Sequence, residues 1–167
     1  AGVLSTGKTS RLYKPLVYDQ KIAKDVSAFQ VSMALGSFFV VQATAAPGKS
    51  IEDLSTALDQ ALQDALSTAP TDEEMNRVLN GWKKSFYGRA ESVLSRAQLL
   101  STYYHIAGDA NYLTRDLARY TMLTSQDIKK AVDQHLAKPR LRIDIIPAPQ
   151  DNAAAPTPAA PNKGGDK

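Results

Sequence analysis

The strand pattern of residues 26–45 constrains the fold more than any other part of the chain. Apolar positions between Val26 and Met33 are interspersed with serine and glutamine, and residues 38–45 continue with β-branched and aromatic side chains. Such residues favour a pleated, half-buried surface. Because only a short connection around Gly36 separates the two runs, we expect an antiparallel hairpin in which Gly36 adopts a positive backbone angle.

Helix patterns dominate the rest of the chain. Leucines recur every fourth residue over residues 54–66, and apolar residues keep three-and-four spacing over residues 75–87. The pattern continues over residues 93–108, where Gly108 predicts a helix stop. Gly88 is expected to bend or interrupt this long helical stretch.

Polar residues mark where several of these helices begin. A hydroxyl at the N-cap accepts a hydrogen bond from a backbone amide that has no partner within the helix. A helix that starts at Asp109 or Asn111 is also expected. The three capping patterns are Ser50-x-x-Asp53, Thr71-x-x-Glu74 and Thr124-x-x-Asp127.

Two further elements are predicted at the ends of this region. Thr9 or Ser10 can cap a helix over residues 11–20, with Pro15 in its first two turns, where a missing amide proton does least damage. Apolar residues alternate with charged ones over residues 141–145, which predicts a last strand that joins the sheet. The fold class that follows is α+β, an antiparallel sheet packed against several helices.

Composition limits the number of domains and the partners. We expect one domain over residues 1–147 and a disordered, Ala/Pro-rich tail over residues 148–167, which has no aliphatic side chain larger than alanine. A net charge of +3 makes nucleic acid a poor candidate partner. The apolar runs are too short for a membrane-spanning segment, and the absence of cysteine excludes thiolate chemistry.

The residues offer no catalytic group and no metal site. The chain contains no His-x-x-Glu-His motif, and neither His105 nor His135 has a second histidine at helical spacing. Glu73 and Glu74 are explained by the first turn of a capped helix, where negative charge complements the helix dipole. We therefore expect no cofactor on this chain.

Several moderately specific motifs occur together in an informative order. They are Gly7 with Ser10-Arg11-Leu12-Tyr13, Ile22-Ala23 before a strand, Pro70-Thr71 with Glu73-Glu74, and Thr124 with Asp127 before the last strand. Over roughly residues 4–147 this order resembles the C-terminal, metal-free module of the pitrilysin and insulinase (M16) family of zinc metallopeptidases, a LuxS-like metallohydrolase fold. Such modules usually begin upstream of the glycine turn, so the resemblance implies an N-terminally truncated module.

The resemblance also implies a function. The chain would be the non-catalytic half of a zinc-dependent endopeptidase and would close a peptide-binding chamber opposite a zinc-bearing half or partner subunit. Zinc would lie in that partner, peptides or unfolded proteins would be the substrate, and the bacterial periplasm would be the compartment. The alternative is an inactive family member that acts as a scaffold or protein-binding subunit.

One substrate contact of the family is altered in this sequence. Family members often carry an arginine, and a tyrosine seven positions later, that hold the substrate backbone. The matching positions here are Val17 and Lys24. Tyr18 and Lys24 remain as polar substitutes for substrate binding, which leaves the scaffold alternative open. We expect Arg11 to form an ion pair at a helix start and Tyr13 to be a packed aromatic.

Overall fold

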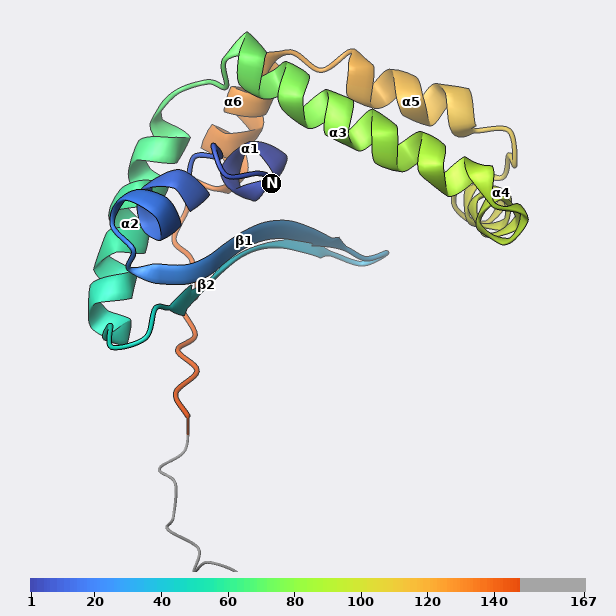
Figure 1. Cartoon of the computed structure of the whole chain (residues 1–167). Coiled ribbons are helices and arrows are strands. Elements are labelled where there is room, and N and C mark those ends of the chain that lie inside the picture. Colours follow the sequence, from blue (N-terminus) through green and yellow to red (C-terminus); the bar gives the residue numbers. More distant parts are fainter. Residues whose placement is uncertain (148–167) are drawn as a thin grey trace, which may run out of the picture.

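The computed structural model describes residues 1–147, and the predicted disordered tail lies outside the described residues. The fold is α+β, with helices packed against a two-stranded antiparallel sheet (Figure 1). In chain order the elements are α1 Gly2–Ser5, the π-helix η1 Lys14–Asp19, β1 Ala23–Ser32, β2 Ser37–Ala45, α2 Ile51–Ser67, α3 Asp72–Glu91, α4 Val93–Ala107, α5 Leu113–Thr121 and α6 Ser125–His135.

The predicted hairpin is confirmed. β1 and β2 pair in an antiparallel register that places Phe29 opposite Val40, and a β-bulge interrupts the ladder between Ala23 and Asp25. The prediction for Gly36 is wrong, because this glycine does not have a positive φ. The backbone N–H of Met33 donates to the carbonyl oxygen of Gly36 at 3.1 Å, so the turn closes without a left-handed residue there.

One face of the hairpin forms the main core with α1, η1 and α2. Leu12 and Leu16 are fully buried in it. The leucine stripe of α2 packs into the same cluster, as its four-residue spacing predicts. The buried residues of this cluster are Leu4, Leu12, Leu16, Ala23, Val26, Ala28, Leu54, Ala61, Leu62 and Ala65. This helix-covered part, residues 1–67, is called the body below.

The three predicted caps are confirmed. The hydroxyl of Ser50 accepts a hydrogen bond from the amide of Asp53 at 3.0 Å, at the start of α2. Both α3 and α6 begin with a reciprocal capping box. In each box the threonine hydroxyl accepts from the third helical amide, and the acidic side chain accepts from the N-cap amide, so two otherwise unpaired donors are satisfied.

Helices α3, α4 and α5 form an arm that extends from the body and curves over the end of the hairpin (Figure 1). The helix is not interrupted at Gly88, which was one of the two predicted effects of this glycine, because α3 continues to Glu91 and Ser92 caps α4. Gly108 ends α4 with φ of 68°, as predicted. Neither Asp109 nor Asn111 caps α5, which has Tyr112 at its N-cap position.

The predicted helix over residues 11–20 is wrong in both length and type. Its regular part is the π-helix η1, which has Tyr13 at its N-cap and no side-chain cap from Thr9 or Ser10. The N–H of Gln20 donates to the carbonyl oxygen of Pro15, a five-residue step. Pro15 has no N–H to donate, which removes one of the bonds that would hold an α-helix in register.

The predicted last strand is also wrong for the described residues. Residues 141–147 are neither helix nor strand. The side chains of Leu141, Ile143 and Ile145 are strongly exposed, and Arg140 forms an ion pair with Asp59 on α2. Alternation gives a segment the ability to form a strand, but a strand also needs a partner, and this segment pairs with no strand within residues 1–147. No helix within the same residues is long and apolar enough to span a membrane.

Candidate functional site

The predicted substrate-binding residues lie in the most irregular backbone of the body. Tyr18 belongs to the π-helix η1, and Lys24 lies at the β-bulge that opens β1. Between them Lys21 has φ of 52°, a left-handed conformation that is uncommon for a lysine. π-Helical turns, bulges and left-handed residues recur next to functional sites, because they direct side chains in ways that regular elements do not.

Val17 and Lys24, which match the arginine and tyrosine positions of the family's substrate clamp, differ in side-chain exposure. Tyr18 is 70% exposed, and Lys24 is exposed as well, so both can reach a ligand. Val17, which stands where the family often has its arginine, packs against the core of the body. The first clamp position is therefore occupied by a packing residue, whereas the second presents an ammonium group to solvent.

The sequence carried only part of this information. Pro15 signalled a disturbed helix, but nothing in the local sequence distinguishes a π-helix from a shortened α-helix. The bulge at Lys24 had no local signal, because it results from how β1 is aligned with β2.

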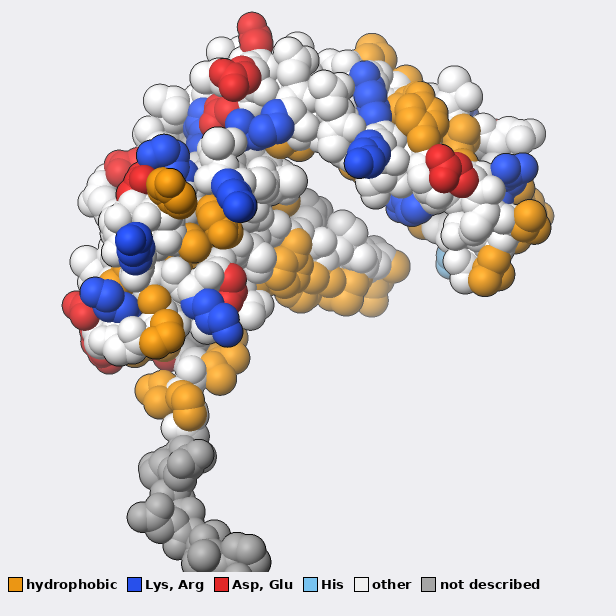
Figure 2. Space-filling view, in the orientation of Figure 1, with side chains coloured by type: hydrophobic (Ala, Val, Ile, Leu, Met, Phe, Trp, Pro, Cys, Tyr) orange, Lys and Arg blue, Asp and Glu red, His pale blue; other side chains and the backbone are white. Residues whose placement is uncertain are grey.

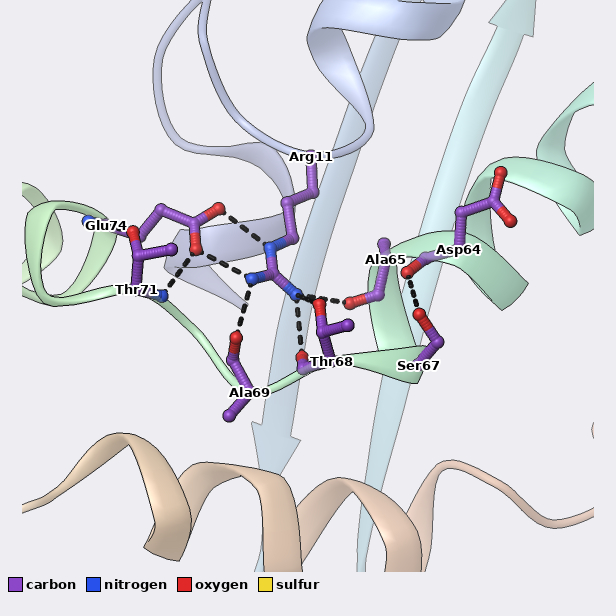
Figure 3. A network of polar contacts seen from close by, with 8 residues as sticks. All are labelled: Arg11, Asp64, Ala65, Ser67, Thr68, Ala69, Thr71 and Glu74. Carbon is purple, nitrogen blue, oxygen red and sulfur yellow. Dashed lines mark hydrogen bonds and ion pairs between the residues drawn. The ribbon is translucent and has the colours of Figure 1, made fainter.

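Arg11 is the centre of the densest polar network of the described residues (Figure 3). Its Nε and Nη2 donate to the two carboxylate oxygens of Glu74, each at 2.7 Å. Its Nη1 donates to the carbonyl oxygens of Ala65 at 2.7 Å and Thr68 at 2.8 Å, and Nη2 donates to that of Ala69 at 2.9 Å. Arg11 thus forms an ion pair, as expected, but at the start of α3 and not at the start of the helix predicted over residues 11–20.

This network joins three parts of the chain. Arg11 satisfies carbonyl groups at the end of α2 and in the connection to α3, which have no partner within a helix. Glu74 also accepts the amide of Thr71 at 2.8 Å as part of the capping box. The hydrogen bonds from Arg11, followed by the one from Thr71, lower the pKa of Glu74 to about 2. A bidentate pair of this kind fixes orientation as well as distance, so Arg11 sets where the arm leaves the body.

The face of the hairpin opposite the core is apolar and is not covered by the body helices. Phe29 and Val31 on β1 lie opposite Val40 and Phe38 on β2. Phe29 and Phe38 are about half exposed. Figure 2 shows hydrophobic side chains gathered along the outer half of the hairpin. We call Phe29, Val31, Phe38 and Val40 the open sheet face. Such a surface can contact an extended apolar polypeptide.

The arm has its own small cluster of aromatic side chains. Trp82 stacks on Phe86, with ring centroids 4.9 Å apart, and on Tyr120, at 4.1 Å. The hydroxyl of Tyr103 donates to the carboxylate of Asp116 at 2.9 Å, which ties α4 to α5. Burial and this carboxylate raise the pKa of Tyr103 to about 12. A groove of about 370 Å³ lies nearby, lined by residues of α3, α4 and α5 that include Arg96 and Leu99.

No group of three or more potential metal ligands occurs within residues 1–147. His105 lies in the last turn of α4 and His135 in the last turn of α6. Neither histidine is placed with other ligands of the kind that zinc binds.

Solved structures with this fold come from bacterial peptidases. A structure described as a candidate zinc protease from Bordetella pertussis is 22% identical, with a TM-score of 0.69, and the match covers 81% of this chain and 74% of that one. The inactive peptidase domain of a candidate zinc protease from Bordetella parapertussis is 21% identical, with a TM-score of 0.70 and coverage of 81% and 72%. At these identities the likeness concerns the fold. The chain therefore has the α+β fold of an inactive peptidase domain.

The sequence comparison points to the same family as the motifs. The family model described as the peptidase M16 inactive domain matches residues 1–81, which include η1, the hairpin and the Arg11 network. The match covers 81 of the 167 residues, and over them the chain resembles the inactive, C-terminal domain of M16 peptidases, as the sequence motifs indicated. No curated protein matches the chain at a significant level. The periplasmic protease PqqL from Escherichia coli shares the fold at 18% identity and a TM-score of 0.59, with the match covering 70% of this chain and 13% of that protein.

Proposed function

We propose that this chain is the non-catalytic half of a zinc-dependent M16 endopeptidase and that it closes a peptide-binding chamber opposite a zinc-bearing half. The observation that carries the proposal is the open sheet face. The helices of the body cover one side of the hairpin, while Phe29 and Phe38 remain about half exposed on the other. A rigid, uncharged wall of this kind suits extended apolar segments of peptides or unfolded proteins.

In this proposal the chain supplies binding and exclusion of water, and the partner supplies the bond cleavage. Zinc held by the partner would supply polarisation of the scissile carbonyl and activation of a water molecule. The open sheet face removes solvent from one side of the substrate. Tyr18 and Lys24 extend from the irregular segment of the body, where a phenol hydroxyl and an ammonium group can donate hydrogen bonds to peptide carbonyl oxygens.

A reconstitution experiment tests this function. The chain is mixed with a candidate zinc-bearing M16 half, and cleavage of a quenched fluorescent peptide is followed with and without chelator. We expect cleavage only when both proteins and zinc are present. Cleavage by this chain alone, or an unchanged rate when it is added to the zinc-bearing protein, would contradict the proposal.

Substitutions on the open sheet face and at Tyr18 and Lys24 test the two parts of the proposal separately. Phe38→Ser should raise KM for apolar peptides, and the pair Tyr18→Phe with Lys24→Met should weaken binding of all peptides, because it removes donors to the backbone. Lys84→Met on the exposed side of α3 is the matched control and should leave KM unchanged. Unchanged KM in the Tyr18 and Lys24 variant would remove these two residues from the proposal and leave the wall intact.

A second candidate function is that of a scaffold or protein-binding subunit without peptidase activity. The packing of the partly buried Val17 against the core of the body favours it, because a valine has no donors with which to hold a substrate backbone as an arginine does. This function predicts that the chain binds the zinc-bearing protein, or another subunit, without changing any cleavage rate. Binding measured by calorimetry beside the same cleavage assay separates the two candidates.

The periplasm is the compartment that we propose for the parent protein. The support is the fold shared with PqqL, which is a periplasmic protease. Fractionation of cells that express the parent protein with a C-terminal tag tests this proposal, and recovery in the cytoplasmic fraction would contradict it.

A further inference from the structure

Residues 141–146 have the pattern of a strand but no sheet to join within the described chain. Four aliphatic side chains of this segment, Leu141, Ile143, Ile145 and Ile146, are between 70% and 85% exposed. Its two central charges compensate each other, because Nε of Arg142 donates to a carboxylate oxygen of Asp144 at 2.8 Å. The segment therefore offers a neutral, alternately apolar strand to a partner edge. We call it the donor segment.

Hydrogen bonds identify which groups of the hairpin point outward. The hydroxyl of Ser5 bonds both the N–H of Ala28, at 2.9 Å, and its carbonyl oxygen, at 3.4 Å, so both groups point away from β2. The Met33 N–H instead bonds across the hairpin to Gly36. These two contacts fix the alternation of the antiparallel ladder: in pairs such as Ala28 with Val41, the backbone groups of both residues face outward.

The outer edge of β2 is consequently an acceptor for another strand. By the same alternation Phe39, Val41 and Ala43 present their N–H and C=O groups at this edge, and no partner for these groups occurs within residues 1–147. Ser5 caps the corresponding edge of β1 at Ala28, whereas β2 has no such cap in the described chain. The outer edge of β2 is thus open along its length.

The donor segment and the outer edge of β2 have compatible charges. No charged residue occurs from position 26 to position 48, so β2 lacks the lysines and other charges that usually protect an edge strand from pairing. A donor segment whose arginine and aspartate neutralise each other brings no unpaired charge to this edge. Its apolar row would also extend the open sheet face beside Phe38 and Val40.

We propose that the donor segment of one copy of this chain pairs with the outer edge of β2 of a second copy, and that the exchange is reciprocal. Arg140 holds the start of the segment against Asp59 on α2, and the chain then runs across the direction of the strands and away from the body (Figure 1). The segment is therefore presented outward. Since each copy carries both a donor and an acceptor, two exchanges close a twofold dimer.

The oligomeric state as a function of concentration tests the exchange. Sedimentation velocity of the full chain should show a concentration-dependent dimer, and Ile143→Asp should abolish it, because a carboxylate would be placed in the apolar row. Leu94→Asp is the matched control, since Leu94 is a similarly exposed aliphatic residue on α4. A monomer at all concentrations, or a dimer that persists in Ile143→Asp, would overturn the proposal.

Cysteine cross-linking distinguishes a second copy from the chain's own sheet. The chain has no cysteine, so single-cysteine variants are unambiguous. A mixture of Ile143→Cys and Val40→Cys proteins should form a disulfide-linked heterodimer, and a mixture of Ile143→Cys and Ser101→Cys should not. Absence of the first heterodimer, or a disulfide that forms only within one chain carrying both substitutions, would overturn exchange between copies.

Discussion

The body and the arm of this module are stabilised in different ways. Ten buried residues between Leu4 and Ala65 form one continuous core in the body. In α3, α4 and α5, by contrast, the buried hydrophobic residues are Phe86 and Tyr103, and large aliphatic side chains such as Leu94 and Ile106 remain exposed. The comparison shows that burial of aliphatic surface holds the body together, whereas stacked rings and a few polar contacts hold the arm.

The connection between the two regions is polar. Arg11 of the body holds Glu74 at the first turn of the arm, together with carbonyl groups of the segment between α2 and α3. A small contact between Gly2 and Val78 supports it, since a Cβ added at Gly2 would lie 2.6 Å from a methyl carbon of Val78. The arm can therefore loosen while the body remains folded, which gives separate tests of each region.

The largest effect is expected from a cavity in the body. Leu16→Ala removes a fully buried side chain and should lower the free energy of unfolding by about 3 kcal/mol. Urea denaturation followed by circular dichroism measures this change. Leu94→Ala, on the exposed surface of α4, is the control and should change stability by less than about 0.5 kcal/mol. Equal losses in the two variants would show that the core of the body is not the main source of stability.

The second effect concerns the connection. Glu74→Gln removes the charge that Arg11 pairs with and should cost about 2 kcal/mol at neutral pH. Because the folded pKa of Glu74 is lowered to about 2, its contribution is present above the ordinary glutamate pKa and is lost as the pH falls from about 4.5 towards 2. The stability difference between wild type and variant should shrink over that range.

Glu73→Gln is the control for this substitution, because Glu73 shares the first turn of α3 and has an exposed side chain. It should change stability little. Hydrogen exchange adds a regional measurement. Glu74→Gln should accelerate exchange in α3 more than in β1, and the reverse order would contradict the assignment of Arg11 and Glu74 to the connection.

A smaller effect is expected within the arm. Tyr103→Phe removes the hydrogen bond to Asp116 and should cost about 1 kcal/mol at neutral pH. Since the folded pKa of Tyr103 is raised to about 12, the protonated phenol stabilises the fold below the ordinary pKa of about 10, and this stabilisation is lost as the pH rises from 10 towards 12.

The fluorescence of Trp82 reports this loss, because it is the one tryptophan of the chain and stacks within the arm. The stability advantage of wild type over Tyr103→Phe should disappear as the pH rises through the alkaline range. Tyr104→Phe, at the exposed neighbouring position, is the control and should be as stable as wild type at every pH. A difference that does not depend on pH would rule out the tyrosine–carboxylate bond as its source.

The smallest effect belongs to a local cap. Thr124→Ala removes the hydroxyl that accepts from the amide of Asp127 at the start of α6 and should cost about 0.5 kcal/mol. Thr124→Ser keeps the hydroxyl and should restore most of the loss. Thermal unfolding of the three proteins measures it, and a loss as large as that of Leu16→Ala would show that α6 is part of the main core.

The features predicted correctly are those that depend on residues close together in the chain. The capping boxes join residues three positions apart, and the hairpin joins two runs across a short turn, so local sequence contains both partners. The helix over residues 11–20 failed because Pro15 lacks an amide donor and the segment forms the π-helix η1, which local sequence does not distinguish from a short α-helix. The last strand failed because alternation describes a segment and not the edge it would pair with.

For the candidate site, too, some features could be predicted from the sequence and others could not. Sequence motifs indicated the family and pointed to Tyr18 and Lys24, but the π-helix that carries Tyr18 and the bulge at Lys24, which results from the alignment of β1 with β2, are seen only in the structure. The packing of Val17 in the core likewise depends on the assembled fold.

By itself, the sequence determined the fold class, the helix starts, the hairpin and the absence of a His-x-x-Glu-His motif, because each of these is encoded in neighbouring residues or in a complete residue inventory. Only the tertiary structure decided that Arg11 joins the body to the arm, that one face of the hairpin is left open, and that residues 141–146 stand apart from the sheet. These features depend on contacts between distant segments, whose free energy is set by burial and pairing in three dimensions.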